Sequence, residues 1–415
     1  MDGRFRPLAD LTIPTDSTRI AAVQGPFSIR RPFLLFAVVS CALVAFGTVM
    51  LLGIEVDVHL APGDDVHYLS MVCQCHWPSQ NLPWSIHLVP SPFRYRILVP
   101  WIARQLPFGA ATSLRLVTYA SLGASYFVML LTCQRLGLSS RASVGGLALA
   151  YVFEPHLYSY YNPFLVDGFG LMVVTGMAYA FVVDSFWMFA LLGLTGLFAR
   201  EVAFALLPLW CVRDVKRGLA LTLIALLLLA VERIVLTGSG VTLLDASHIG
   251  LNRLLHLRLF AIDIETTWVW AWAVVPIGIS LLPPRAFASI GPLSLVLLAA
   301  AVASSLLAAD VFRMFVILMP VVAIGGAQLI ATLTARKHVV WLAILFGLVA
   351  VQFCVSGANA WLGPDLYIAM ATSIRTMRLG ALWAAVAVFL LRRDVAQGVR
   401  EKLLDAHLLA RAFTL

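Results

Sequence analysis

Apolar runs long enough to cross a lipid bilayer recur along most of the chain. A helix needs about 17–25 residues to cross the hydrocarbon core, and about twelve such segments can be counted. One stretch, 185–211, is interrupted by Arg200 and Glu201. The others lie at 32–53, 111–133, 142–160, 164–183, 218–237, 266–283, 287–308, 314–333, 339–356 and 377–391. With 61% hydrophobic and only 12% charged residues, the chain is not a soluble enzyme. We predict an all-α, multi-pass membrane protein.

The basic residues between these runs predict the orientation. Cytoplasmic loops of membrane proteins carry excess Lys and Arg. With twelve crossings, every other loop holds a basic cluster; these are Arg30 and Arg31; Arg135 and Arg141; Arg213, Lys216 and Arg217; Arg285; Arg336 and Lys337; and Arg392 and Arg393. This alternation requires 185–211 to be two short helices that meet near Arg200 at the outer face, with both termini cytoplasmic. The net charge of +8 is then a topology signal, and no nucleic-acid partner is expected.

The predicted organisation is one membrane domain with two cytoplasmic ends. Residues 1–31 lack a cleavable signal pattern and are expected to form a cytoplasmic arm. The membrane domain covers 32–392, with outer loops at 55–110 and 238–265. The tail, 393–415, has leucines at helical spacing between basic residues, which is typical of a helix lying on the inner leaflet.

The first outer loop contains an acidic motif followed by a basic, aromatic segment. Asp64 and Asp65 stand just past the membrane surface, with Tyr68 close behind. Adjacent acids in a loop gain nothing from each other's charge, which favours a functional role. The segment 92–104 suits a short helix lying at the interface, and it would bring Arg94 and Arg96 near the acids.

Charged residues within the other apolar segments also gather at predicted outer ends. A charge inside a membrane segment is costly and indicates a functional site by default. These residues are Glu154, Arg200, Glu201, Glu232, Arg233, Asp310 and Arg313, with Asp167, Tyr158, Tyr160 and Tyr161 on a neighbouring outer turn. One outward-facing polar cavity would explain them together. The alternative is structural: the charges pair with one another, and the tyrosines anchor helices at the interface.

The outer cysteines leave three interpretations open. Cys73 and Cys75, followed by His76, could bind metal, form a local disulfide or remain free thiols. A structural zinc site normally brings a second ligand pair, and none is evident in the sequence.

The residue types at the outer side suit transfer from a phosphate-linked donor. Arginines bind phosphate through paired donors. A carboxylate can take a proton from an attacking hydroxyl, or can hold a metal. A lipid phosphate would keep its chain in the bilayer while its head reaches the outer surface.

The order of these features resembles the GT-C superfamily of polyprenyl-phosphate-dependent glycosyltransferases. The resemblance rests on a first membrane helix, then Asp64-Asp65-x-x-Tyr68, then the interfacial basic helix, and it covers 32–392. The superfamily includes protein O-mannosyltransferases and lipid A aminoarabinose transferases. The stretch 197–201, with Arg200 and Glu201, is similar to a step found in bacterial members, and Asp310-Val311-Phe312-Arg313 resembles their late helix start.

The resemblance implies a hexosyl- or pentosyltransferase in a bacterial inner membrane, with its site facing outward. Asp64 would be the catalytic residue of the acidic loop, which deprotonates or orients the acceptor hydroxyl, and Asp65 would be the second acidic position. The remaining candidates for the substrate and phosphate site are Arg94, Arg96, Tyr68, Arg200, Glu201, Asp310, Arg313 and Asp167. No cofactor is required, although Asp64 and Asp65 could hold Mg²⁺ or Mn²⁺. The donor would be a polyprenyl-phosphate sugar, and the acceptor a lipid, a glycan or a protein.

Two other functions fit parts of the pattern. A transporter or flippase of a lipid-linked or anionic substrate would also use outer charges, although such proteins usually show internal repeats and binding groups at mid-membrane. A membrane-bound acyl- or phosphotransferase would use His67 or His76 as its base.

Overall fold

The computed structural model describes residues 30–50, 65–75, 85–86, 89, 93–151, 159–160, 162–200, 202–237, 275, 278–307 and 315–335. Every regular element within these ranges is a helix. The predicted segments at 339–356 and 377–391, the outer loop at 238–265 and the tail at 393–415 lie outside the described residues. So does the arm at 1–31, apart from Arg30 and Arg31, which begin the first described helix.

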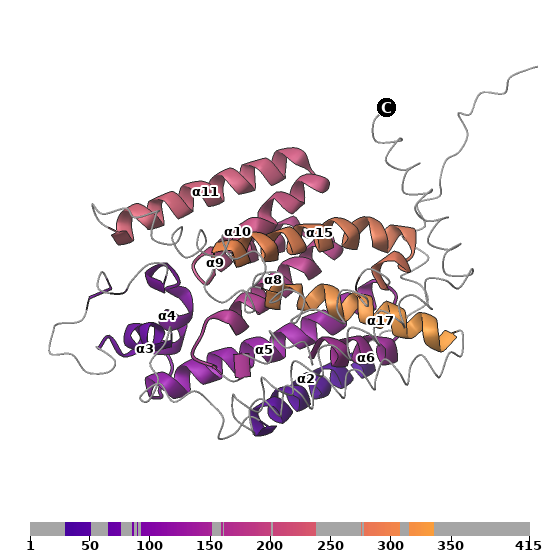
Figure 1. The fold of residues 1–415 in the computed structure, drawn as a ribbon, viewed down its shortest axis with the longest axis horizontal. Helices are drawn as coiled ribbons and strands as arrows, with labels where there is room; N and C mark the ends of the chain where they lie inside the picture. Colours follow the sequence, from indigo (N-terminus) through magenta and orange to yellow (C-terminus); the bar gives the residue numbers. More distant parts are fainter. Residues whose placement is uncertain are drawn as a thin grey trace, which may run out of the picture.

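Within the described residues, five helices are long and apolar enough to cross a membrane. The qualifying stretches are Pro32–Val49, Ala110–Arg135, Val215–Leu236, Pro284–Ala303 and Phe315–Ala335. They belong to α2 (Arg30–Met50), α5 (Ala110–Arg135), α11 (Val215–Thr237), α15 (Pro284–Leu307), and η4 (Phe315–Leu318) with α17 (Met319–Ala335). The long helices lie roughly side by side along the horizontal of Figure 1. This part of the chain is therefore an all-helical bundle of membrane type.

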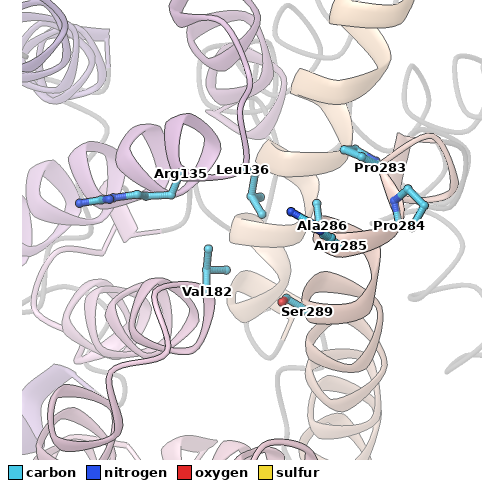
Figure 2. A pocket seen from close by; sticks show the side chains of 8 residues that line it. All are labelled: Arg135, Leu136, Val182, Pro283, Pro284, Arg285, Ala286 and Ser289. Atoms are coloured by element: carbon cyan, nitrogen blue, oxygen red, sulfur yellow. The ribbon is translucent and has the colours of Figure 1, made fainter. Parts of the chain in front are cut away.

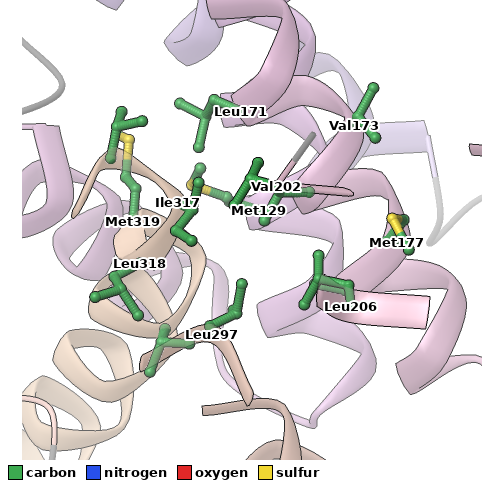
Figure 3. Close-up of a cluster of buried hydrophobic side chains, with 14 of the residues drawn as sticks. Met129, Leu171, Val173, Met177, Val202, Leu206, Leu297, Ile317, Leu318 and Met319 are labelled. Carbon is green, nitrogen blue, oxygen red and sulfur yellow. The ribbon is translucent and has the colours of Figure 1, made fainter. Parts of the chain in front are cut away.

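Shorter apolar helices fill the space between the long ones. They are α6 (Ser140–Tyr151), α8 (Asp167–Val182), α9 (Phe186–Leu197), α10 (Val202–Leu206) and η3 (Leu207–Val212). Helix α8 packs along α5, and α6 packs along α17. Side chains from α5, α8, α10, α15, η4 and α17 meet in the core shown in Figure 3.

Small residues allow α6 and α17 to approach closely. A Cβ atom added at Gly146 would overlap the carbonyl oxygen of Ala323 and the backbone nitrogen of Ala327. Glycine and alanine at such contacts let the two backbones touch, which is the usual way for helices to associate in lipid. The crossing of α6 and α17 is therefore fixed by residues that have almost no side chain.

Local signals in the sequence set the helix ends. Helix α5 ends at Arg135, and Gly137, two residues further on, has a φ of +84°, a conformation that glycine adopts without a steric penalty. Asp214 accepts a hydrogen bond from the Arg217 N–H at 3.1 Å and so caps the start of α11. These turns hold Arg135, Arg213 and Arg217 at helix ends.

The outward faces of α2 and α11 are covered with exposed apolar side chains. Large exposed side chains on α11 include Leu223, Leu227, Ile234 and Val235. A contiguous apolar surface of this kind is unfavourable in water and marks a face that contacts lipid or another apolar partner. These apolar faces are what is expected of membrane helices on the side that contacts lipid.

Candidate functional site

The acidic motif begins a short helix, α3 (Asp65–Cys73). Asp65 is its first residue, where a carboxylate interacts favourably with the helix dipole, and its side chain is buried at 1% exposure. Tyr68 lies one turn further on and is completely buried. Residues three apart share a helix face, so Asp65 and Tyr68 lie on the same side of α3. Asp64 immediately precedes this helix and lies outside the described residues.

The basic segment folds back onto α3. It forms a 3-10 turn, η2 (Phe93–Tyr95), and a short helix, α4 (Leu98–Arg104), with Arg96 between them. The Arg96 guanidinium donates a hydrogen bond to the Tyr68 hydroxyl at 3.0 Å and lies 5.9 Å from the Phe93 ring centroid. The Phe93 ring also packs edge-on against Tyr68. Arg96 thus contacts Tyr68, which lies on the helix that begins with Asp65.

The single interfacial helix predicted over 92–104 is wrong in detail, because it is broken at Arg96 and Ile97. Ile97 is the N-cap of α4, and Pro100 stands in the first turn of α4, where its missing N–H costs no hydrogen bond. Both α3 and α4 lie at the left end of the bundle in Figure 1. Trp101 on α4 is 60% exposed, as suits an anchor at a membrane interface.

The interrupted stretch 185–211 is a helical hairpin, as the sequence predicted. Helix α9 runs toward Arg200, and α10 with η3 returns from it. The Phe189 and Trp210 ring centroids are 5.1 Å apart, and closer to the tip a Cβ on Gly196 would meet Ala203 at 2.9 Å. Arg200 therefore stands at the tip, where the two short helices meet.

Arg200 forms a buried ion pair with Asp167, the first residue of α8. The two side chains are each 4% exposed, and the pair joins Arg200 Nη1 to Asp167 Oδ1 at 2.6 Å. Gly170 makes room for it, because a Cβ there would lie 2.9 Å from the Arg200 Cδ. The structural alternative, in which Arg200 pairs with a charge on an adjacent helix, is therefore realised in this conformation.

The ion pair is recessed from the end of the bundle. The Thr118 hydroxyl donates a hydrogen bond to the Pro163 carbonyl at 2.7 Å, which places the approach to α8 beside Thr118. Thr118 lies eight residues inside α5, or about 12 Å along the helix axis. Asp167 and Arg200 therefore lie below the level at which α5 begins.

A backbone hydrogen bond links the first loop to the hairpin tip. The Leu98 N–H donates to the Phe198 carbonyl at 3.0 Å. Arg96 lies two residues before Leu98 in the chain, and Arg200 lies two residues after Phe198. The Tyr68–Arg96 pair and the Asp167–Arg200 pair consequently belong to one end of the bundle.

The last turn of α11 reaches the same end. The Arg233 guanidinium lies 3.4 Å from the Tyr95 ring centroid. Glu232, the preceding residue in the chain, is buried. Both residues stood out in the sequence as charges in an apolar segment, but nothing there indicated Tyr95 as a partner. Arg233 adds a cation next to the segment that carries Arg96.

Tyr160 lies in the core rather than on an outer turn facing solvent. Its hydroxyl is 2.8 Å from the Tyr126 hydroxyl, and its ring stacks on Tyr119. The Tyr151 hydroxyl donates to the Leu43 carbonyl at 3.0 Å in the same cluster. These tyrosines join α2, α5 and α6, a role that helical spacing alone did not reveal.

The cysteine question is decided in favour of the local disulfide. Cys73 and Cys75 are bonded to each other at the end of α3. Across the described ranges, no group of three or more His, Cys, Asp or Glu side chains could hold a metal ion.

Five of the predicted site residues are described with their side chains: Asp65, Tyr68, Arg96, Asp167 and Arg200. The structure brings them to one end of the bundle as two bonded pairs and a buried acid. Outside the described residues lie Asp64, Glu201, Asp310 and Arg313, as well as the side chain of Arg94.

These features define a class of protein: an all-helical bundle of membrane type with a polar site at one end. Comparison of the chain with protein-family models, curated proteins and solved structures found no match.

Proposed function

We propose that the protein is a membrane glycosyltransferase that moves a sugar from a polyprenyl-phosphate donor to an acceptor hydroxyl. The observation that carries the proposal is the hydrogen bond from Arg96 to Tyr68, which joins the basic segment to the acidic motif. A cation and a carboxylate motif held together at one helical end are the groups that a phosphate leaving group and an attacking hydroxyl require.

In the proposed reaction, the acceptor oxygen attacks the anomeric carbon as the bond from that carbon to the phosphate oxygen breaks. The acceptor proton passes to Asp64, and the donor phosphodiester leaves as a phosphate monoester with one more negative charge. Arg96 and Arg94 are assigned to stabilise that charge. Asp65, buried in the first turn of α3, positions the motif. Adjacent carboxylates are suitable ligands for Mg²⁺ or Mn²⁺, but the reaction as written needs no metal.

The ion pair of Asp167 and Arg200 is assigned a positioning role in this scheme. It holds the hairpin tip against α8, and the tip in turn holds α4 through the Leu98–Phe198 bond. The lipid chain of the donor would lie along exposed apolar helix faces. Placement in a bacterial inner membrane, with the site outward, belongs to the same proposal.

A transporter or flippase is the second candidate, and the recessed ion pair is the observation that favours it. Transport sites commonly lie toward the middle of the membrane. Both candidates would bind an anionic lipid-linked substrate, so binding alone does not separate them.

The test uses the full chain reconstituted in vesicles with a panel of labelled polyprenyl-phosphate sugars and a mixture of glycan, lipid and peptide acceptors. The proposal expects release of polyprenyl phosphate together with label on one acceptor. Movement of intact donor between leaflets, without cleavage, would overturn it in favour of transport. No cleavage with any donor, from protein that is folded by circular dichroism, would also overturn it.

A further inference from the structure

A second polar region lies at the opposite end of the bundle, in a pocket of about 550 Å³. The end of α5 contributes Arg135 and Leu136, and the end of α8 contributes Val182. The start of α15 contributes Arg285, Ala286 and Ser289. In Figure 2 these helix ends surround the pocket, and the Arg135 guanidinium points away from it, leaving Arg285 and Ser289 as its polar lining.

Positive charge dominates around this pocket. Arg213 donates a hydrogen bond to the Ser289 hydroxyl at 2.7 Å, and its guanidinium lies 4.9 Å from the Phe181 ring centroid. Its nearest carboxylate in the described residues is Asp184, which is 4.0 Å away and 68% exposed. An exposed pair at this distance gives little net attraction. Arg285 in the lining and Arg213 beside it therefore leave a positive surplus at this end of the pocket.

The remaining walls are apolar. Leu136, Val182 and Ala286 line the pocket below the arginines. Further along α15, Leu295 is 70% exposed on a helix long and apolar enough to cross a membrane. A small inorganic anion would use the rim and leave these walls empty, whereas an amphiphilic anion would use both.

We propose that this pocket binds the headgroup phosphate of an anionic glycerophospholipid, with the glycerol and upper acyl chain against the apolar wall. Arg285 and Ser289 would donate to the phosphate, and Arg213, bonded to Ser289, would supply charge beside it. The volume lies within the range of small-molecule sites, about 300–1,000 Å³. Basic pockets between helices on the cytoplasmic side are suited to anionic lipid headgroups. The proposal is independent of the reaction at the other end.

The test measures lipid retained by the purified full chain in micelles containing equal phosphatidylglycerol and phosphatidylcholine, by native mass spectrometry. We expect preferential retention of phosphatidylglycerol. Arg285→Ala should lower that retention about tenfold, because it removes one charge-assisted contact. Arg285→Lys should restore part of it. Lys216→Ala is the matched control, since it removes one charge at the same end but outside the pocket, and it should leave retention unchanged.

Three results would overturn the proposal. One is an equal loss in Lys216→Ala, which would mean that general surface charge holds the lipid. Another is equal retention of phosphatidylcholine by the wild-type protein. The third is complete displacement of phosphatidylglycerol by millimolar inorganic phosphate, which would identify the free anion as the ligand. Because Arg285 is exposed, its replacement should leave the thermal midpoint in lipid-free detergent unchanged, which separates lost binding from lost folding.

Discussion

Arg96 and Tyr68 are 28 residues apart in sequence, yet the guanidinium of one donates a hydrogen bond to the hydroxyl of the other at 3.0 Å. This bond fixes the basic segment of the first loop over the helix that begins with the acidic motif. The proposed chemistry depends on that arrangement, because the groups that bind the leaving phosphate and the group that deprotonates the attacking hydroxyl must lie close together.

Tyr68→Phe tests this bond directly. The change keeps the buried ring and removes only the hydroxyl that holds Arg96. A hydrogen bond to a charged group contributes about 1.5–3 kcal/mol, so sugar transfer should fall about tenfold or more. Steady-state rates with the active donor give the measurement. Tyr179→Phe, on α8, is the matched control and should keep full activity. Equal rates of sugar transfer in the two variants would contradict the role of Tyr68 in positioning Arg96.

The buried pair of Asp167 and Arg200 predicts a non-additive effect on stability. Asp167→Leu alone leaves the Arg200 charge buried without its carboxylate, which should cost about 3–5 kcal/mol. The double variant Asp167→Leu with Arg200→Met removes both charges and should be more stable than either single variant. Unfolding in detergent, followed by circular dichroism, provides the comparison. If the losses in unfolding free energy of the two single variants simply add in the double variant, the two charges do not stabilise each other.

The contact of α6 with α17 predicts different outcomes at two adjacent glycines. Gly146→Ala places a methyl group against the α17 backbone at Ala323, which cannot move aside cheaply, so the thermal midpoint should drop by several degrees. Gly145→Ala meets only the end of the Ile330 side chain, at 2.7 Å, and that side chain can rotate. Its midpoint should change much less. A larger drop in thermal midpoint for Gly145→Ala than for Gly146→Ala would contradict the close approach of the α6 and α17 backbones.

The disulfide of Cys73 and Cys75 offers a test of sidedness. In a variant that keeps only these two cysteines, a membrane-impermeant maleimide should not react until a reductant is added. After reduction, labelling should occur from the outer face of intact cells, because α3 lies at the predicted outer end. Labelling only after permeabilisation would show that α3 faces the cytoplasm, the reverse of the predicted orientation.

The sequence predicted those elements whose signal is local. Runs of apolar residues located α2, α5, α8, α11 and α15, and charge alternation together with Arg200 and Glu201 predicted the hairpin of α9 and α10. Partners could not be predicted in the same way. Nothing in the stretch around Arg200 indicates Asp167, and nothing around Tyr160 indicates Tyr126, because these contacts depend on how distant helices pack. The break at Arg96 likewise reflects packing of the segment against α3.

The most direct test of the central claim is the rate at which enzyme-bound donor releases polyprenyl phosphate in a single turnover, compared between wild type and Asp64→Asn. The amide retains the shape of the acid but cannot accept the acceptor proton, so release should fall by about 100-fold or more. Asp214→Asn is the control, because asparagine still caps α11 and the residue lies at the opposite end. Loss of release in Asp64→Asn alone is the predicted result. Unchanged release in Asp64→Asn would contradict the catalytic role assigned to the acidic motif.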